Sequence, residues 1–121
     1  MLGVRDVPAT VRYYVDELGW SVDSSYPEGD EPSWARVVSG GGRLMFTQFH
    51  YHEGEDPDDD HPVAAALTGS IYLYVDDVEA EWERLRDRVE VTAPLAKMEW
   101  GMQEFTVKDI NGYSLVFGKV T

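Results

Sequence analysis

A repeated pattern along the chain constrains its fold more than any other feature of the sequence. A shift of the sequence by 71 positions aligns Val4 with Val75. The same shift aligns other pairs of identical residues, near the start and near the end of each half. One offset that aligns both ends indicates two related modules. The other matching pairs are Asp6 with Asp77, Val7 with Val78, Ala9 with Ala80, Gly41 with Gly112, Leu44 with Leu115 and Phe46 with Phe117.

Each half contains the pattern of one amphipathic helix. In the first half, Asp6 is a suitable N-cap, Pro8 falls in the first turn and Gly19 supplies a C-terminal stop. Asp77 occupies the corresponding N-cap position in the second half. The apolar residues that follow at helical spacing are Val7, Val11, Tyr14, Val15 and Leu18 in the first helix and Val78, Trp82, Leu85 and Val89 in the second.

Short segments with the composition and alternation of β-strands make up much of the rest of each half. The glycines at 40–42 and the pair Asn111-Gly112 predict tight turns between consecutive strands. The predicted strands are 34–38, 43–48, 71–75, 103–107 and 114–119.

The order of these elements predicts the fold class. A short strand, a helix and then a group of strands form a βαβββ module, and two such modules give an α+β fold. The segment 53–67 is broken by Gly and Pro and is rich in acids, so we expect an exposed acidic loop there. We therefore predict one domain over 1–121, made of modules at about 1–52 and 68–121.

The composition excludes several classes of function. The 23 acidic and 10 basic residues give a net charge of −13, which argues against nucleic acid as a partner. No apolar run approaches the roughly 20 residues that cross a bilayer, so we expect no membrane partner. The absence of cysteine excludes disulfides and thiolate chemistry and fits a cytoplasmic protein. The negative charge is explained by surface solubility or by a cationic ligand.

Three stretches of the sequence are similar to a known family. They are the opening Val-Arg-Asp-Val at 4–7 with Gly19-Trp20, the segment 71–77 that ends in Val-Asp-Asp, and the block Trp-Gly-Met-Gln-Glu-Phe at 100–105. Together they resemble the vicinal oxygen chelate superfamily, which includes glyoxalase I, extradiol dioxygenases and bleomycin-resistance proteins. The block at 100–105 is most similar to the bleomycin-resistance branch. The resemblance implies a curled mixed sheet around a cup, with helices on the outer face, and a homodimer.

The resemblance also bears on metal binding. Metal-dependent members of the family hold a divalent ion with His and Glu side chains on the cup faces of the strands. The spacing of the family pattern places Ser70 at the second-module His, Val116 at the second-module Glu and Met45 at the first-module Glu. These side chains do not replace imidazole and carboxylate, so the resemblance implies no metal, no cofactor and no catalytic residue at these positions.

Two other groups of polar residues offer alternative metal sites. His50 and His52 would point to the same side of a strand, and Glu53 follows them, so Zn or Ni could bind there. Solvated surface histidines explain the same pattern. The alternating acids at 56–60 resemble the start of a calcium loop, but the required Gly and closing Glu are missing from it.

Alternation along the strands predicts which side chains face the cup. Tyr72, Glu104 and Val116 face inwards if their neighbours pack against the helices. A carboxylate in an apolar cup needs a partner, which would be Arg43, Gln103, another subunit or a cationic ligand. Aromatic walls with a few polar groups are typical of small-molecule sites, although such residues equally suit a core or a dimer interface. The predicted ligand-binding residues are Trp34, Met45, Tyr72, Tyr74, Trp100, Glu104 and Val116.

Three functions are consistent with this pattern. The first is a metal-independent protein that sequesters an aromatic or cationic small molecule in a dimeric cup, as in antibiotic resistance to bleomycin. The second is a metal-dependent lyase, isomerase or dioxygenase of the same superfamily, for which His50, His52 and Glu53 are the visible ligands. The third is an accessory dimer scaffold whose cup has lost its ligand.

Overall fold

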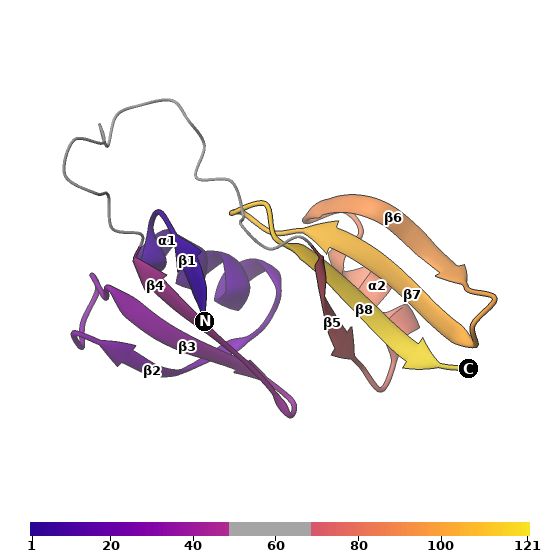
Figure 1. The fold of residues 1–121 in the computed structure, drawn as a ribbon, viewed down its shortest axis with the longest axis horizontal. Helices are drawn as coiled ribbons and strands as arrows, with labels where there is room; N and C mark the ends of the chain where they lie inside the picture. Colours follow the sequence, from indigo (N-terminus) through magenta and orange to yellow (C-terminus); the bar gives the residue numbers. More distant parts are fainter. Residues whose placement is uncertain (49–68) are drawn as a thin grey trace. The chain divides into compact units, whose positions relative to one another are not determined.

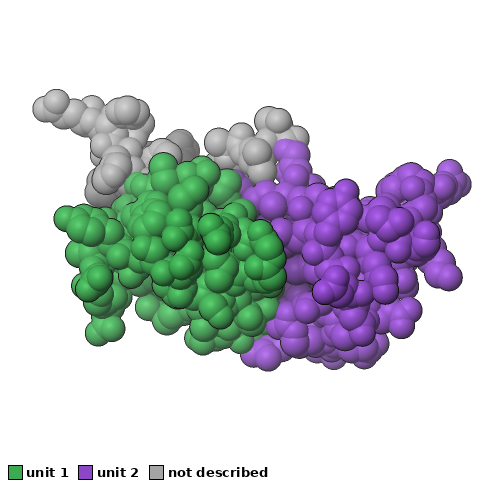
Figure 2. Space-filling view, turned by 90° about the horizontal axis from the view of Figure 1, so that it is seen from below, with its two compact units in different colours: residues 1–66 green, residues 67–121 purple. Residues whose placement is uncertain are grey.

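The computed structural model describes residues 1–48 and 69–121. The chain divides into two compact units, residues 1–66 and 67–121, which Figure 2 shows in different colours. Each unit contains one mixed four-stranded sheet with a helical segment between its first and second strands (Figure 1). The α+β fold with a βαβββ module used twice is therefore confirmed.

The first unit has strand order β1-β4-β3-β2, with β1 parallel to β4 and the other pairs antiparallel. α1 packs against β3 and β4. The elements are β1 (Leu2–Val4), α1 (Val7–Arg12), the π-helical turn η1 (Tyr13–Glu17), β2 (Ser21–Tyr26), β3 (Trp34–Ser39) and β4 (Gly42–Gln48).

The second unit repeats this arrangement with strand order β5-β8-β7-β6. Its only parallel pair is β5 with β8, and α2 packs against β7 and β8. The elements are β5 (Ser70–Tyr74), α2 (Val78–Leu85), β6 (Glu90–Lys97), β7 (Met102–Lys108) and β8 (Ser114–Val120).

The sequence repeat also appears in the strand register. Leu2 lies opposite Phe46 in the first sheet, and Leu73 lies opposite Phe117 in the second. Both members of the pair are displaced by the same 71 positions that align the two halves of the sequence. The repeat therefore reflects two modules with the same parallel pairing.

The first helix differs from the regular helix that its sequence predicts. It is α-helical only to Arg12 and continues as a π-helical turn, in which the Leu18 N–H bonds to the Tyr13 carbonyl at 3.2 Å. The π-helical turn ends at Glu17, and Gly19, two residues later, has a φ of 78°. Beside it, the buried Tyr14 ring packs edge-to-face on Trp20, with ring centroids 5.4 Å apart. The π-helical turn is thus accompanied by aromatic packing. The spacing of the apolar residues alone does not predict such a turn.

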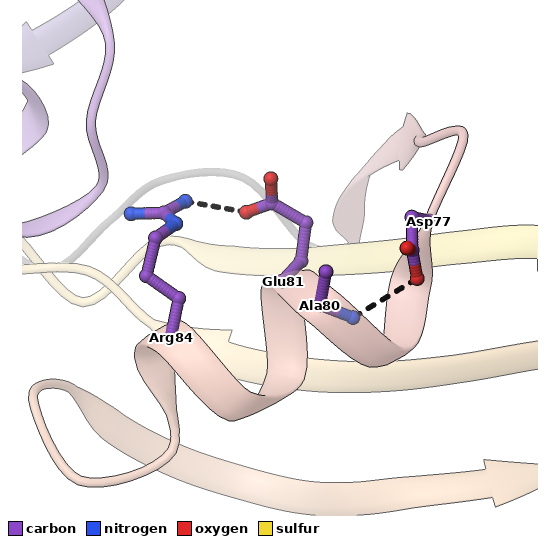
Figure 3. Close-up of polar contacts among 4 residues, drawn as sticks. All are labelled: Asp77, Ala80, Glu81 and Arg84. Carbon is purple, nitrogen blue, oxygen red and sulfur yellow. Dashed lines mark hydrogen bonds and ion pairs between the residues drawn. The ribbon is translucent and has the colours of Figure 1, made fainter.

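The second helix begins at the predicted cap but is shorter than predicted, because α2 ends at Leu85 and Val89 lies beyond it. The Asp77 side chain accepts a hydrogen bond from the Ala80 N–H at 3.0 Å, and Glu81 forms an ion pair with Arg84 on the same helix (Figure 3). On the opposite side, Trp82 packs against Phe105 of the sheet, with ring centroids 5.3 Å apart. The cap sets the start of the helix, and the aromatic contact fixes the face that it presents to the sheet.

Three strands were not among the segments predicted from the sequence, and of these β1 was expected only as a short strand of unstated bounds before the first helix. β2 and β6 are both at the edge of their sheets. β2 contains several serines and is largely exposed, so it lacks the apolar alternation of a half-buried strand. β6 contains Pro94, which a sheet tolerates at an edge, where its missing N–H need not pair. The formation of β2 and β6 therefore depends more on pairing with β3 and β7 than on the sequence of the two strands themselves.

None of the helices in the described ranges is long and apolar enough to span a membrane.

Removing the Asp77 cap should destabilise the protein. Asp77→Ala leaves the Ala80 N–H without its acceptor, so the free energy of unfolding should fall by about 1 kcal/mol in urea titrations. Asp76→Ala is the matched control, because it removes the same charge from the adjacent exposed position. An equal loss of stability in the two variants would show that charge, and not the cap, is responsible.

Candidate functional site

One face of the second sheet brings together four of the predicted site residues. Phe105 of β7 contacts Trp82 of α2, so the next residue, Glu104, points to the opposite side of the sheet. The strand register then places the neighbouring side chains on that same side. We call this surface the tyrosine face, and its residues are Tyr72, Tyr74, Glu104, Thr106, Val116 and Gly118.

A hydrogen bond across three strands organises the tyrosine face. The Tyr72 hydroxyl, on β5, donates to Glu104 Oε2, on β7, at 2.7 Å. The phenol reaches Glu104 by lying over Gly118 of the intervening strand β8. A Cβ atom at Gly118 would lie 2.0 Å from the Tyr72 hydroxyl oxygen, which is far inside contact distance. Any side chain at 118 would therefore force the phenol out of the position from which it donates to Glu104.

Sequence reasoning placed Tyr72 and Glu104 on the same face but missed Gly118. The available signal was its position, two residues after Val116 on a predicted strand. That signal was not sufficient, because a contact with Gly118 depends on the pairing of β5 with β8. The structure shows that Gly118 lies opposite Tyr74 and Glu104 in the sheet.

The partner of Glu104 differs from the side chains considered from the sequence. Gln103 donates instead to the Glu79 carboxylate at 3.4 Å, and Arg43 lies on β4 of the first unit. Across residues 1–48 and 69–121, no lysine or arginine forms an ion pair with Glu104. Tyr72 is thus its hydrogen-bond partner within these ranges.

The environment of Tyr72 keeps its phenol protonated. Partial burial raises the pKa of Tyr72 well above its ordinary value, and the hydrogen bond to Glu104 and the negative charge of that carboxylate raise it further. The hydroxyl therefore remains a hydrogen-bond donor above the pH at which an ordinary phenol ionises. The Tyr72–Glu104 pair therefore presents one net negative charge when the carboxylate is ionised.

Tyr74 extends the aromatic surface beside this pair. Its ring centroid is 4.9 Å from that of Tyr72, with the planes inclined at 52°. Tyr74 is 76% exposed, which is unusual for so large a side chain beside another aromatic ring. Such an arrangement offers two inclined aromatic rings with a carboxylate nearby, which suits a planar or cationic small molecule.

The other three predicted site residues lie elsewhere. Trp34 and Met45 belong to β3 and β4 of the first unit, where Met45 pairs with Arg36 across the strands. Trp100 lies in the turn between β6 and β7 of the second unit and is 68% exposed. The structure therefore groups Tyr72, Tyr74, Glu104 and Val116 on one sheet, and does not group these three with them within that sheet.

The positions that correspond to the family's metal ligands do not fit a divalent ion. The Ser70 hydroxyl lies 3.2 Å from the hydroxyl of Ser114, and Val116 and Met45 offer no imidazole or carboxylate. Within the described part of the chain, no three His, Asp or Glu side chains cluster as metal ligands would. His50, His52, Glu53 and the acids at 56–60 lie outside the described residues.

Two hollows lie away from the tyrosine face. One, of about 360 Å³, lies beside α1 and β2 and includes Val11, Arg12 and Val22 in its lining. The other, of about 270 Å³, lies at the start of α2, and its lining includes Asp76, Asp77 and Glu79, of which Asp77 already caps the helix. Neither hollow contains a residue predicted to bind the ligand.

The raised pKa of Tyr72 gives a testable pH dependence. In the unfolded chain this phenol ionises near pH 10, whereas in the folded protein it stays neutral to higher pH. The stability that Tyr72 contributes should be present below pH 10 and should decline as the pH rises above it. Tyr72→Phe should therefore be less stable than wild type at neutral pH, and the difference should shrink above about pH 10.

Tyrosinate absorbance provides the direct measurement. Wild type and Tyr72→Phe should absorb equally up to about pH 10 and diverge only at higher pH. A difference that has already reached half of its final size at about pH 10 would show that Glu104 and burial do not hold the Tyr72 phenol in its neutral form.

Comparisons with known proteins agree with this fold. A sequence profile of the Glyoxalase/Bleomycin resistance protein/Dioxygenase superfamily matches residues 1–117. Comparison with curated proteins gave no match. Among solved structures, TioX from Micromonospora sp. ML1 is 20% identical over 99% of this chain and 92% of its own, with a TM-score of 0.77. UcmS2 is 20% identical over 96% of this chain and 91% of its own, with a TM-score of 0.74.

A third solved structure is the bleomycin-binding protein from bleomycin-producing Streptomyces verticillus, in complex with copper(II)-bleomycin. It is 27% identical over 96% of this chain and 88% of its own, with a TM-score of 0.67. The superfamily profile extends through both modules, in agreement with the repeated βαβββ unit. The chain belongs to the Glyoxalase/Bleomycin resistance protein/Dioxygenase superfamily.

Proposed function

We propose that this protein is a metal-independent binding protein that sequesters an aromatic or cationic small molecule without breaking a bond in it. The observation that supports this most strongly is the tyrosine face, where the adjacent Tyr72 and Tyr74 rings lie beside the hydrogen-bonded Glu104. These groups provide stacking surface and a negative charge. None of the residues of the tyrosine face is a serine, cysteine or histidine, so the face has no nucleophile paired with a histidine base.

A bleomycin-type glycopeptide is the first ligand to test. The Streptomyces verticillus protein is described with copper(II)-bleomycin, and its 27% identity extends over nearly the whole of this chain. A protein of this kind would protect the cell by sequestering the antibiotic. Its affinity for the antibiotic would therefore determine how well it protects. Antibiotic resistance is then the biological role that we propose, in the cytoplasm and without nucleic acid or membrane partners.

The proposed site is larger than the tyrosine face alone. We propose that the two modules form one domain, that their sheets surround a shared cup, and that the protein acts as a homodimer. Trp34 and Met45 would complete the cup from the first module, and Trp100 would form a wall or lid. Their apolar side chains would add contact area to the stacking surface of the tyrosines.

Ligand titration tests the proposal. Isothermal titration with metal-free bleomycin, copper(II)-bleomycin and simpler planar cations should detect binding to at least one of them. Tyr74→Ala should weaken that binding by about tenfold, because it removes the exposed ring of the site. Tyr26→Ala is the control, since Tyr26 is similarly exposed, at 72%, on β2 of the first unit. Absence of binding across the panel, or equal affinities of wild type and Tyr74→Ala, would contradict the proposal.

Metal analysis separates this proposal from the alternative of a metal-dependent lyase, isomerase or dioxygenase. Untagged protein dialysed against a chelator should contain no stoichiometric divalent metal and should bind its ligand as tightly as before. A stoichiometric ion that survives dialysis would favour the enzyme. In that case His50→Ala and His52→Ala would show whether the segment after β4 provides the ligands.

A further inference from the structure

One oxygen of the Glu104 carboxylate, Oε1, has no hydrogen-bond donor among the described residues. Oε2 accepts the hydrogen bond from Tyr72, whereas no described residue donates to Oε1 or forms an ion pair with this carboxylate. Glu104 is only half-exposed on the tyrosine face. The second oxygen of this carboxylate is therefore available to a ligand that reaches the tyrosine face.

The nearest lysines on the neighbouring strands point away from Glu104. Lys97 of β6 and Lys119 of β8 both lie directly opposite Gln103 of β7. Gln103 is adjacent to Glu104, so these lysines lie on the other side of the sheet. Lys108 shares the side of Glu104 but is opposite Ser114, four residue pairs further along the strands. The sheet itself thus supplies no counter-charge to the free oxygen.

The position of the carboxylate is set in advance of binding. Tyr72 and Glu104 come from β5 and β7, and Gly118 of β8 between them leaves the space that the phenol occupies. Sheet strands hold side chains more precisely than loops do. The ordering of Glu104 therefore does not have to occur when the ligand binds.

The aromatic surroundings add to the preference for positive charge. Ring faces attract cations, and Tyr74 lies 4.9 Å from Tyr72, between ring centroids, on the same side of the sheet as Glu104. A neutral ligand of the same shape would gain the stacking contact but not the charge interactions. An anionic ligand would be repelled by Glu104.

We propose that Glu104, held by Tyr72 across Gly118, binds a protonated nitrogen of the ligand, so that the site selects organic amines or amidines over neutral molecules of the same shape. The inference rests on the proposed binding function and adds to it the charge class of the ligand. Glu104 would contact the ligand, whereas Tyr72 and Gly118 are positioning residues.

A series of probes with one shape and different charges tests this selection. The probes are 2-naphthamidine, which is cationic, 2-naphthamide, which is neutral, and 2-naphthoate, which is anionic. Dissociation constants would be measured on the full chain by protein-observed NMR titration at neutral pH. We expect the amidine to bind at least about tenfold more tightly than the amide, and the naphthoate to bind most weakly.

Variants connect the preference to the named residues. Glu104→Gln keeps the shape of the side chain and should lower the amidine-to-amide ratio severalfold, leaving only the preference for positive charge that the tyrosine rings supply. Gly118→Ala should lower the ratio severalfold, because the methyl group displaces the Tyr72 phenol. Gly41→Ala should leave the ratio unchanged, since a Cβ there meets no atom within 4 Å. Tyr72→Phe tests the same positioning role if Gly118→Ala does not fold.

The possible outcomes separate the inference from the function on which it rests. If all three probes bind alike, or if the preference for the amidine is undiminished in Glu104→Gln, the inference is wrong and the binding function stands. If an unchanged ratio is found in both Gly118→Ala and Tyr72→Phe, the positioning role is wrong. If neither these probes nor the bleomycin-type ligands bind, the proposed function itself fails.

Discussion

The parallel pairing of the first and last strands of each module is the constraint on which the structure depends. In the second unit, the register that sets Leu73 opposite Phe117 also sets Tyr72 opposite Val116 and Tyr74 opposite Gly118. A parallel pair needs a long crossover, which the α2 helix and the two strands after it provide. A shift by one residue would turn Tyr72 into the core and separate it from Glu104.

Much of this architecture could be predicted from the sequence. The offset that aligns Asp6 with Asp77 identified both helix caps, and the structure confirms that each carboxylate accepts a backbone N–H three residues later. The Asn111-Gly112 turn was also predicted correctly, with Gly112 at a φ of 90° between β7 and β8. These features are local, because caps and turns are determined by a few consecutive residues.

The features that escaped prediction depend on partners far along the chain. The edge strands β2 and β6 form because β3 and β7 offer hydrogen-bonding edges. The π-helical turn after Arg12 accompanies packing of Tyr14 on Trp20 and Phe46. The role of Gly118 depends on its contact with Tyr72, to which no sequence pattern around Gly118 points. Local sequence identified the elements of the site, whereas strand register determined which side chains meet.

The central claim is that the tyrosine face is where this protein binds its ligand. Mapping of backbone amide shifts during titration with metal-free bleomycin tests that claim most directly, because every described strand is monitored at once. The account predicts that the largest changes cluster on β5, β7 and β8 around Tyr72, Tyr74 and Glu104. Changes confined to the hollow beside α1 and β2, around Val11 and Val22, would contradict it.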